Sequence, residues 1–269
     1  MNAIDKYNAR ADHINSLLCI GLDTNIARLP RELREGDETP QLTFNRRIIE
    51  QTHSYAAAYK LNIAFYEAQG AAGWHELELT MRYLRSEYPD IYTICDAKRA
   101  DIGSTNEAYA TAIFDRLGFD AITLHPYVGS EGLAPFLERT NKGCIVLCRT
   151  SNVGASELQD LIIADAKERP LWQVVAQTVH SRWNKNGNCM LVVGATYPNE
   201  MRQVRELVGD MPLLVPGIGV QGGNVELTMR AGLNADGKGL IINSSRGIIF
   251  SDDPARAARE LRDAINLYR

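Results

Sequence analysis

Eight short apolar runs recur along the chain, each followed by a longer stretch of mixed polarity. The runs are residues 17–22, 57–63, 91–95, 121–124, 144–148, 190–193, 213–215 and 240–242. Most of them lack the apolar-polar alternation of a half-exposed strand, so we expect parallel strands that are covered on both faces. The pattern therefore predicts a buried sheet of eight parallel strands.

The stretches between the runs show the periodicity of amphipathic helices. The last is the clearest, because Asp253 can cap the helix, Pro254 suits its first position and apolar residues then share one face. The other predicted helices are 44–56, 74–88, 105–117, 131–139, 171–183, 200–208 and 225–231. This alternation favours a (β/α)8 TIM barrel of the α/β class over the alternative, an open doubly wound sheet.

The chain length of 269 residues suits one barrel, and we expect a single domain over residues 1–269. Two long polar connections, 25–43 and 151–170, each follow a strand. The second contains SELQDLIIADA, which has a helical pattern. In a barrel, both connections would lie at the carboxyl-terminal mouth, where ligands bind, so both are candidate lids.

Composition argues against several classes of partner. The net charge is −4 without a dense run of Lys and Arg, so no nucleic-acid partner is expected. The amino terminus has no apolar core of a signal peptide, and no stretch is long enough to cross a bilayer, so no membrane partner is expected. The cysteines have no CxxC spacing and lie mostly in apolar runs, which indicates reduced core residues of a cytoplasmic protein. They are Cys19, Cys95, Cys144, Cys148 and Cys189.

Charged residues gather where three of the predicted strands end. Asp96 and Lys98 follow the run 91–95, Lys60 interrupts the run 57–63, and Asp23 closes the first run. In an extended strand Asp96 and Lys98 point to the same side, so each lysine is expected near two carboxylates. A purely structural network is the alternative, but desolvation costs several kcal/mol per ion, which favours catalysis. Arg99 points away from Lys98 and is expected to be structural.

The motif DAKRADIGST (96–105), with AYKLNIAFYE before it and VPGIG and NSSRGI after it, resembles orotidine 5′-phosphate decarboxylase, in particular its longer bacterial subfamily, type 2. The resemblance runs from CIGLD at residue 19 to Arg246 and so covers nearly the whole chain. The DxKxxD core alone is also shared by related phosphosugar decarboxylases. The resemblance implies conversion of orotidine 5′-phosphate to uridine 5′-phosphate and CO2 in pyrimidine biosynthesis, without a cofactor or a metal.

The resemblance also implies roles for individual residues. Lys98 would protonate the ring carbon, Asp96 would face the substrate carboxylate, and Lys60 would bridge a ribose hydroxyl and Asp96. Asp101 would reach across a homodimer interface into the partner's site. The substrate-binding residues would be Asp23 for the ribose, Thr105 for the neighbouring subunit's nucleotide, Ser151 for the pyrimidine amide edge, Arg246 for the phosphate and Gln221 as its helper.

The chemistry supports these roles. Loss of CO2 from a pyrimidine carbon without an electron sink leaves a carbanion. Asp96 would oppose the substrate carboxylate by about 4 kcal/mol, for unit charges about 4 Å apart at an effective dielectric of about 20. Lys98, kept protonated by Asp96 and Asp101, would stabilise the carbanion and then protonate it.

Two glycine-rich turns follow the last two predicted strands, at residues 216–223 and 244–247. Loops at these places in barrels commonly bind phosphate, because glycines such as Gly247 let the backbone approach and an arginine such as Arg246 can bind through two N–H groups. The turn at 219–224 is shorter than the mobile loop of many family members. We therefore expect residues 151–170 to share the closing role.

Three alternatives remain open. A phosphosugar decarboxylase would hold magnesium on the same carboxylates and would need another acidic ligand, for which Glu67 is the close candidate. An aldolase would form a Schiff base on Lys60 or Lys98. A non-catalytic nucleotide-binding barrel would have kept the fold without the chemistry.

Overall fold

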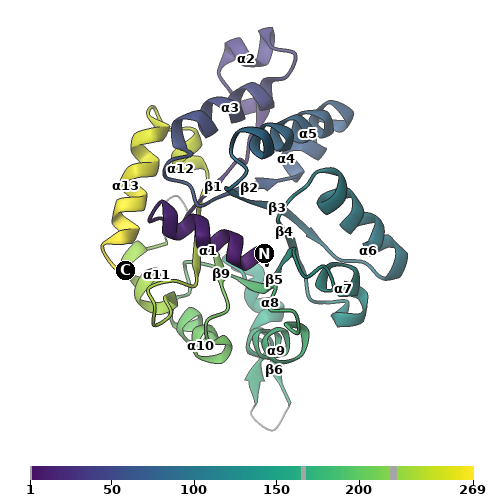
Figure 1. The fold of residues 1–269 in the computed structure, drawn as a ribbon. Helices are drawn as coiled ribbons and strands as arrows, with labels where there is room; N and C mark the ends of the chain where they lie inside the picture. Colours follow the sequence, from purple (N-terminus) through teal and green to yellow (C-terminus); the bar gives the residue numbers. More distant parts are fainter. Residues whose placement is uncertain (1, 165–167, 219–222) are drawn as a thin grey trace.

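A closed barrel of parallel strands forms the centre of the computed structural model, which describes residues 2–164, 168–218 and 223–269 (Figure 1). The barrel strands are β1 (Leu18–Gly21), β2 (Ala58–Asn62), β3 (Tyr92–Arg99), β4 (Ala121–Leu124), β5 (Gly143–Arg149), β8 (Cys189–Val193), β9 (Leu213–Pro216) and β10 (Leu240–Ser244). The sheet closes because β1 pairs with both β2 and β10. The predicted TIM barrel is confirmed, and the open sheet is excluded.

Most of the longer helices surround the strands as a ring (Figure 1). The helices of the described residues are α1 (Ala3–His13), α2 (Arg31–Gly36), α3 (Pro40–Thr52), α4 (Ala64–Glu67), α5 (Gly70–Glu87), α6 (Gly103–Ala110), α7 (Gly129–Leu137), α8 (Ser156–Gln159), α9 (Leu171–Thr178), α10 (Pro198–Val208), α11 (Val225–Gly232), α12 (Arg246–Ile249) and α13 (Pro254–Asn266). Two of them continue as π-helical segments, Thr111–Arg116 after α6 and Val179–Trp183 after α9. Asp253 caps α13 as predicted, since its side chain accepts a hydrogen bond from the Arg256 N–H.

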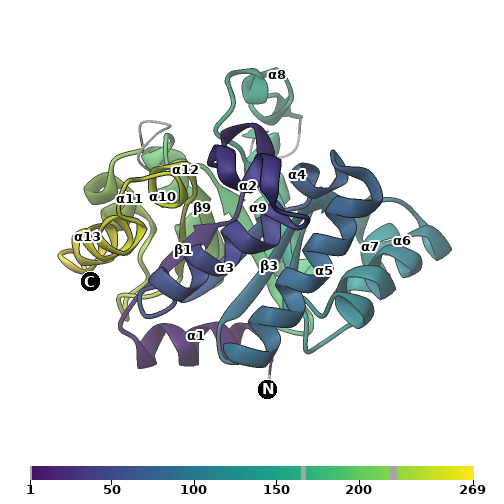
Figure 2. The same ribbon diagram turned by 90° about the horizontal axis from the view of Figure 1, so that it is seen from above.

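The two ends of the barrel differ in how they are covered (Figure 2). Helix α1, which the sequence reading did not predict, packs under the amino-terminal end, and its buried Tyr7 hydroxyl donates to the Leu240 carbonyl at 2.7 Å. Helix α8 lies at the opposite end. The carboxyl ends of the strands therefore form the accessible mouth.

Several predicted boundaries were wrong. Helix α3 begins at Pro40 and ends at Thr52 rather than spanning 44–56, because Pro40 fits the first turn and residues 53–57 lead into β2. Strand β3 continues through its charged end to Arg99. Within its described residues, 156–164, the piece SELQDLIIADA is helical over Ser156–Gln159 and not beyond, and Ile162–Ile163 (β6) pairs in antiparallel fashion with Arg169–Pro170 (β7).

All five cysteines are buried and free. Within the described ranges, no helix is both long and apolar enough to span a membrane.

Candidate active site

A cavity of about 480 Å³ opens at the carboxyl ends of the strands. Seven of the predicted site residues line it, namely Asp23, Lys60, Asp96, Lys98, Ser151, Arg246 and Gly247. Asp101 and Thr105 are not part of this lining, and Gln221 lies outside the described residues. The mouth of the barrel thus gathers most of the predicted site in one place.

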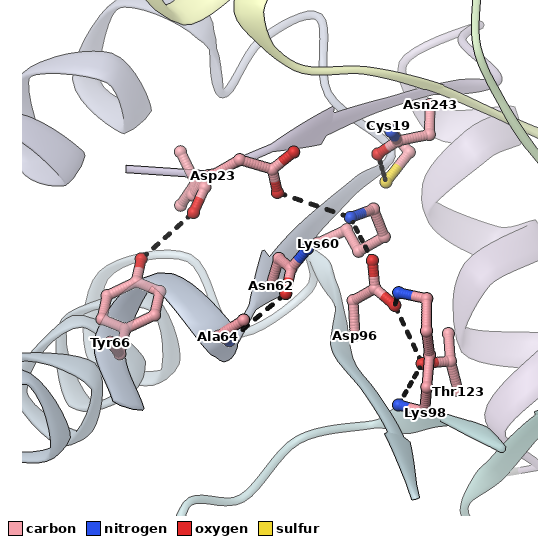
Figure 3. A network of polar contacts seen from close by, with 11 residues as sticks. Cys19, Asp23, Lys60, Asn62, Ala64, Tyr66, Asp96, Lys98, Thr123 and Asn243 are labelled. Carbon is pink, nitrogen blue, oxygen red and sulfur yellow. Dashed lines mark hydrogen bonds and ion pairs between the residues drawn. The ribbon is translucent and has the colours of Figure 1, made fainter. Parts of the chain in front are cut away.

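Four charges of alternating sign form a continuous chain of contacts in this cavity (Figure 3). The Lys60 ammonium lies 2.7 Å from Oδ2 of Asp96 and 3.5 Å from Oδ1 of Asp23. Oδ1 of Asp96 lies 2.6 Å from the Lys98 ammonium. Lys60 and Asp96 are almost fully buried, whereas 49% of the Lys98 side chain is exposed. The outermost charge is therefore a lysine that can reach a bound molecule.

The route of β3 places Lys98 beside Asp96, although not by simple strand alternation. Lys98 has a φ of 47°, in the left-handed region, and the pairing of β3 with β4 shifts between Cys95 and Arg99. Such a conformation costs a non-glycine residue about 1–3 kcal/mol and is found at functional sites. Here the ion pair with Asp96 helps to offset the strain.

Thr123 on β4 is a site residue that the sequence analysis missed. Its hydroxyl donates to Oδ1 of Asp96 at 2.9 Å, and the Thr123 hydroxyl oxygen accepts the backbone N–H of Lys98 at 3.0 Å. The hydroxyl thus fixes the carboxylate and the irregular strand together. The only signal in the sequence is a polar residue inside the apolar run 121–124.

The charges shift each other's pKa values in opposite directions. Burial alone would raise the pKa of the Asp96 carboxyl, but the Lys60 and Lys98 ammonium groups outweigh it and hold that pKa well below its usual value. Burial alone would lower the pKa of Lys60, but the Asp23 and Asp96 carboxylates raise it well above its usual value. Asp96 is therefore anionic and Lys60 cationic throughout the neutral pH range.

Arg99 has the structural role that was expected. Its guanidinium forms an ion pair with Glu67 and lies over the Tyr109 ring, away from the cavity. Glu67, the acidic residue that the magnesium alternative requires as a further ligand, is thus paired with Arg99. Glu67 is not among the residues that line the cavity.

Asp101 is held on the loop between β3 and α6. Its carboxylate accepts the Ile102 N–H at 2.7 Å, and its own N–H donates to the buried Asn106 side chain at 3.0 Å. Among the described residues of this chain, Lys98 forms an ion pair only with Asp96. Asp101 is thus in a defined position but does not complete the network of its own chain.

The described start of the first glycine-rich turn and the second turn both line the cavity, through residues 216–218 and 244–247. Gly21 of β1 permits the second turn to pack against the strand, because a Cβ at position 21 would come within 1.9 Å of the Ser245 hydroxyl. Arg246 is exposed, and its side chain has no hydrogen bond or ion pair within the described parts of the chain. This side of the cavity therefore presents a cation with its hydrogen-bonding groups available.

The segment after β5 covers another side of the mouth. Gln159 of α8 lines the cavity, and its carbonyl oxygen accepts the Thr150 N–H at 2.9 Å and an Arg149 N–H at 3.2 Å. Arg149 is 2% exposed and also forms an ion pair with Asp160. These contacts, which the sequence did not reveal, tie the segment around Ser151 to the end of β5.

Comparison with known proteins shows which family the chain resembles over its length. A family model described as "Orotidine 5'-phosphate decarboxylase / HUMPS family" matches residues 16–261. The chain is 50% identical to "Orotidine 5'-phosphate decarboxylase" of Janthinobacterium sp. (strain Marseille), covering 100% of this chain and 99% of that protein. The corresponding protein of Cellvibrio japonicus is 46% identical, with 100% of both chains covered. The structure of Leishmania donovani OMP decarboxylase superposes with a TM-score of 0.88 at 43% identity, covering 100% of this chain and 98% of that one.

Proposed function

The chain belongs to the orotidine 5′-phosphate decarboxylase / HUMPS family, and we propose that its Lys60–Asp96–Lys98 network carries out the decarboxylation. The chain converts orotidine 5′-phosphate to uridine 5′-phosphate and CO2 in pyrimidine biosynthesis, the activity for which relatives of 46–50% identity over the full length are named. The proposal concerns how the residues of this chain perform that reaction.

The observation that carries the mechanism is an ionised carboxylate between two ammonium groups at the wall of the cavity. Asp96 lies within 2.7 Å of Lys60 and 2.6 Å of Lys98. A substrate carboxylate placed beside Asp96 is repelled, and this repulsion disappears as CO2 leaves. Lys60 and Thr123 hold Asp96 in place, so it cannot turn away from the substrate.

Lys98 supplies the proton. As the bond between the ring carbon and the carboxyl carbon breaks, its electron pair stays on the ring carbon and CO2 departs as a neutral molecule. The nearby ammonium stabilises this carbanion and then transfers a proton from Nζ to the ring carbon. The partly exposed Lys98 side chain can reach the substrate while Asp96 orients it.

The remaining lining residues divide between the ends of the substrate. Asp23, whose side chain is 21% exposed, accepts a hydrogen bond from the ribose, and Ser151 binds the amide edge of the base. Arg246 binds the phosphate through its guanidinium, next to the backbone at Gly247. The position of the free cation at the glycine-rich side supports this orientation.

We further propose a homodimer in which Asp101 and Thr105 of one subunit complete the site of the other. Asp101 is fixed at the rim but outside the cavity of its own chain. Two large apolar side chains at the same rim are exposed, Ile102 by 62% and Tyr127 by 92%. Their exposure on the same side of the barrel as Asp101 supports a partner-covered surface there. The five free cysteines support a cytoplasmic location.

The activity is tested by incubating purified protein with orotidine 5′-phosphate in excess chelator. We expect the orotate absorbance to disappear and CO2 to form at the same rate with and without chelator, because the network supplies charge stabilisation and the proton. A six-carbon sugar phosphate tested in parallel should not react. Unchanged absorbance, or a rate that falls with chelator and recovers with Mg²⁺, would favour the sugar-phosphate alternative.

A further inference from the structure

A cluster of buried polar side chains lies behind Asp23, on the side away from the cavity. Gln41 and Asn45 of α3, Tyr66 of α4 and Thr80 of α5 are all fully buried. Polar groups at such a helix packing surface are costly unless they are hydrogen-bonded, by about 1–3 kcal/mol each. Apolar side chains would pack there without that cost, so packing alone does not explain the cluster.

One contact of the cluster fixes the backbone just before Asp23. Strand β1 ends at Gly21, so the carbonyl of Leu22 is beyond the strand. The Tyr66 hydroxyl donates to this carbonyl at 3.2 Å (Figure 3). The hydroxyl is itself oriented, because the Asn45 amide donates to it at 2.9 Å.

A second set of contacts fixes the backbone just after Asp23. The Gln41 amide donates to the Thr24 carbonyl at 2.8 Å, and the Thr24 hydroxyl donates to the Asn45 carbonyl oxygen at 2.5 Å. The Asn45 side chain thus connects the two sets of contacts, because its oxygen accepts from Thr24 and its nitrogen donates to Tyr66. The residues on either side of Asp23 are held by one hydrogen-bonded unit.

We infer that Gln41, Asn45 and Tyr66 are positioning residues that set the place of the Asp23 carboxylate. This inference rests on the proposed role of Asp23 in binding the ribose. Strand pairing ends with the Leu22 N–H, which donates to the Lys60 carbonyl at 2.8 Å, yet the Asp23 carboxylate one residue later must lie near both Lys60 and the substrate. A displacement of about 1 Å in a group that binds substrate can cost about 100-fold in rate.

The test compares two tyrosine substitutions on the same framework. Tyr66→Phe removes the hydroxyl next to Asp23. Tyr59→Phe is the matched control, because Tyr59 is also fully buried and its hydroxyl contacts Thr52 at 2.7 Å, at the far end of α3. We expect similar losses of thermal stability, whereas only Tyr66→Phe lowers kcat/KM, by about tenfold and mainly through KM.

A double-mutant cycle with Asp23→Asn distinguishes positioning from general damage. If Tyr66 acts through Asp23, Tyr66→Phe should lower kcat/KM by less than about twofold once Asp23 has been replaced. Equal losses in both backgrounds, or no loss in either, would overturn the inference. If Asp23→Asn alone left kcat/KM unchanged, the proposed role of Asp23 would fail first and the inference would fall with it.

Gln41→Met provides an independent variant from the other side of Asp23. It removes the donor to the Thr24 and Phe65 carbonyls and keeps the Tyr66 hydroxyl. We expect Gln41→Met to lower kcat/KM in the unmodified protein but not in the Asp23→Asn background. If Tyr66→Phe does not fold, Gln41→Met can take its place in the double-mutant cycle. Losses that add to that of Asp23→Asn would again overturn the inference.

Discussion

Replacement of Lys98 by alanine is expected to lower kcat by about 10⁴-fold or more, with a much smaller change in KM. The substitution removes the proton donor, which is worth about 10²–10⁴-fold, and also the positive charge that faces the developing carbanion. Most contacts to the ribose and phosphate would remain. Steady-state kinetics from the loss of orotate absorbance measure both constants.

The adjacent cation provides the matched control. Arg99→Ala also removes one positive charge from β3, but this guanidinium pairs with Glu67 outside the cavity. Partly exposed ion pairs contribute little to stability, so kcat should stay within about threefold of the unmodified protein. A Lys98→Ala protein with more than about one hundredth of the activity, or an equal loss in Arg99→Ala, would contradict the proposed proton donor.

Mixed dimers of Asp101→Ala and Lys60→Ala chains are expected to regain about a quarter of the unmodified specific activity, because half of randomly formed dimers are mixed and each has one intact site. The intact site has its own Lys60 and the partner's unmodified aspartate at position 101. Each variant alone should be nearly inactive. Coexpression, or dissociation and reassembly, followed by the absorbance assay, measures the recovery.

A second mixture tests whether the recovery comes from sharing. Lys60 and Lys98 line the cavity of the same chain, so mixed dimers of Lys60→Ala and Lys98→Ala contain no intact site and should stay inactive. No recovery with Asp101→Ala and Lys60→Ala chains, in dimers shown to be mixed, would refute the shared site. The homodimer proposal would then lose its functional basis.

The barrel could be predicted because buried parallel strands leave a strong signal in sequence. The run 121–124 coincides with β4, and most other runs match their strands to within one or two residues. The exception is β3, because the apolar run ends at Cys95 whereas the strand continues through charged residues to Arg99. Those charges continue the strand because they face a polar cavity and pair with each other.

The charged part of the site could also be predicted from the sequence. A charged residue such as Lys60 is conspicuous inside an apolar run that forms a buried strand. The neutral parts could not. Thr123, Asn45 and Gln159 act through hydrogen bonds to residues that mostly only the fold brings close, and a threonine or an amide in a sequence has many ordinary explanations. Their roles depend on tertiary geometry, which periodicity does not encode.

The most direct test of the account is a crystal structure with the product, uridine 5′-phosphate, bound. The account predicts that Lys98 Nζ lies about 3–3.5 Å from the ring carbon that carried the carboxyl group, with Asp96 beside that carbon and the phosphate at Arg246. A complex in which Lys98 points into solvent away from Asp96, or in which the phosphate occupies the place beside Asp96, would contradict it.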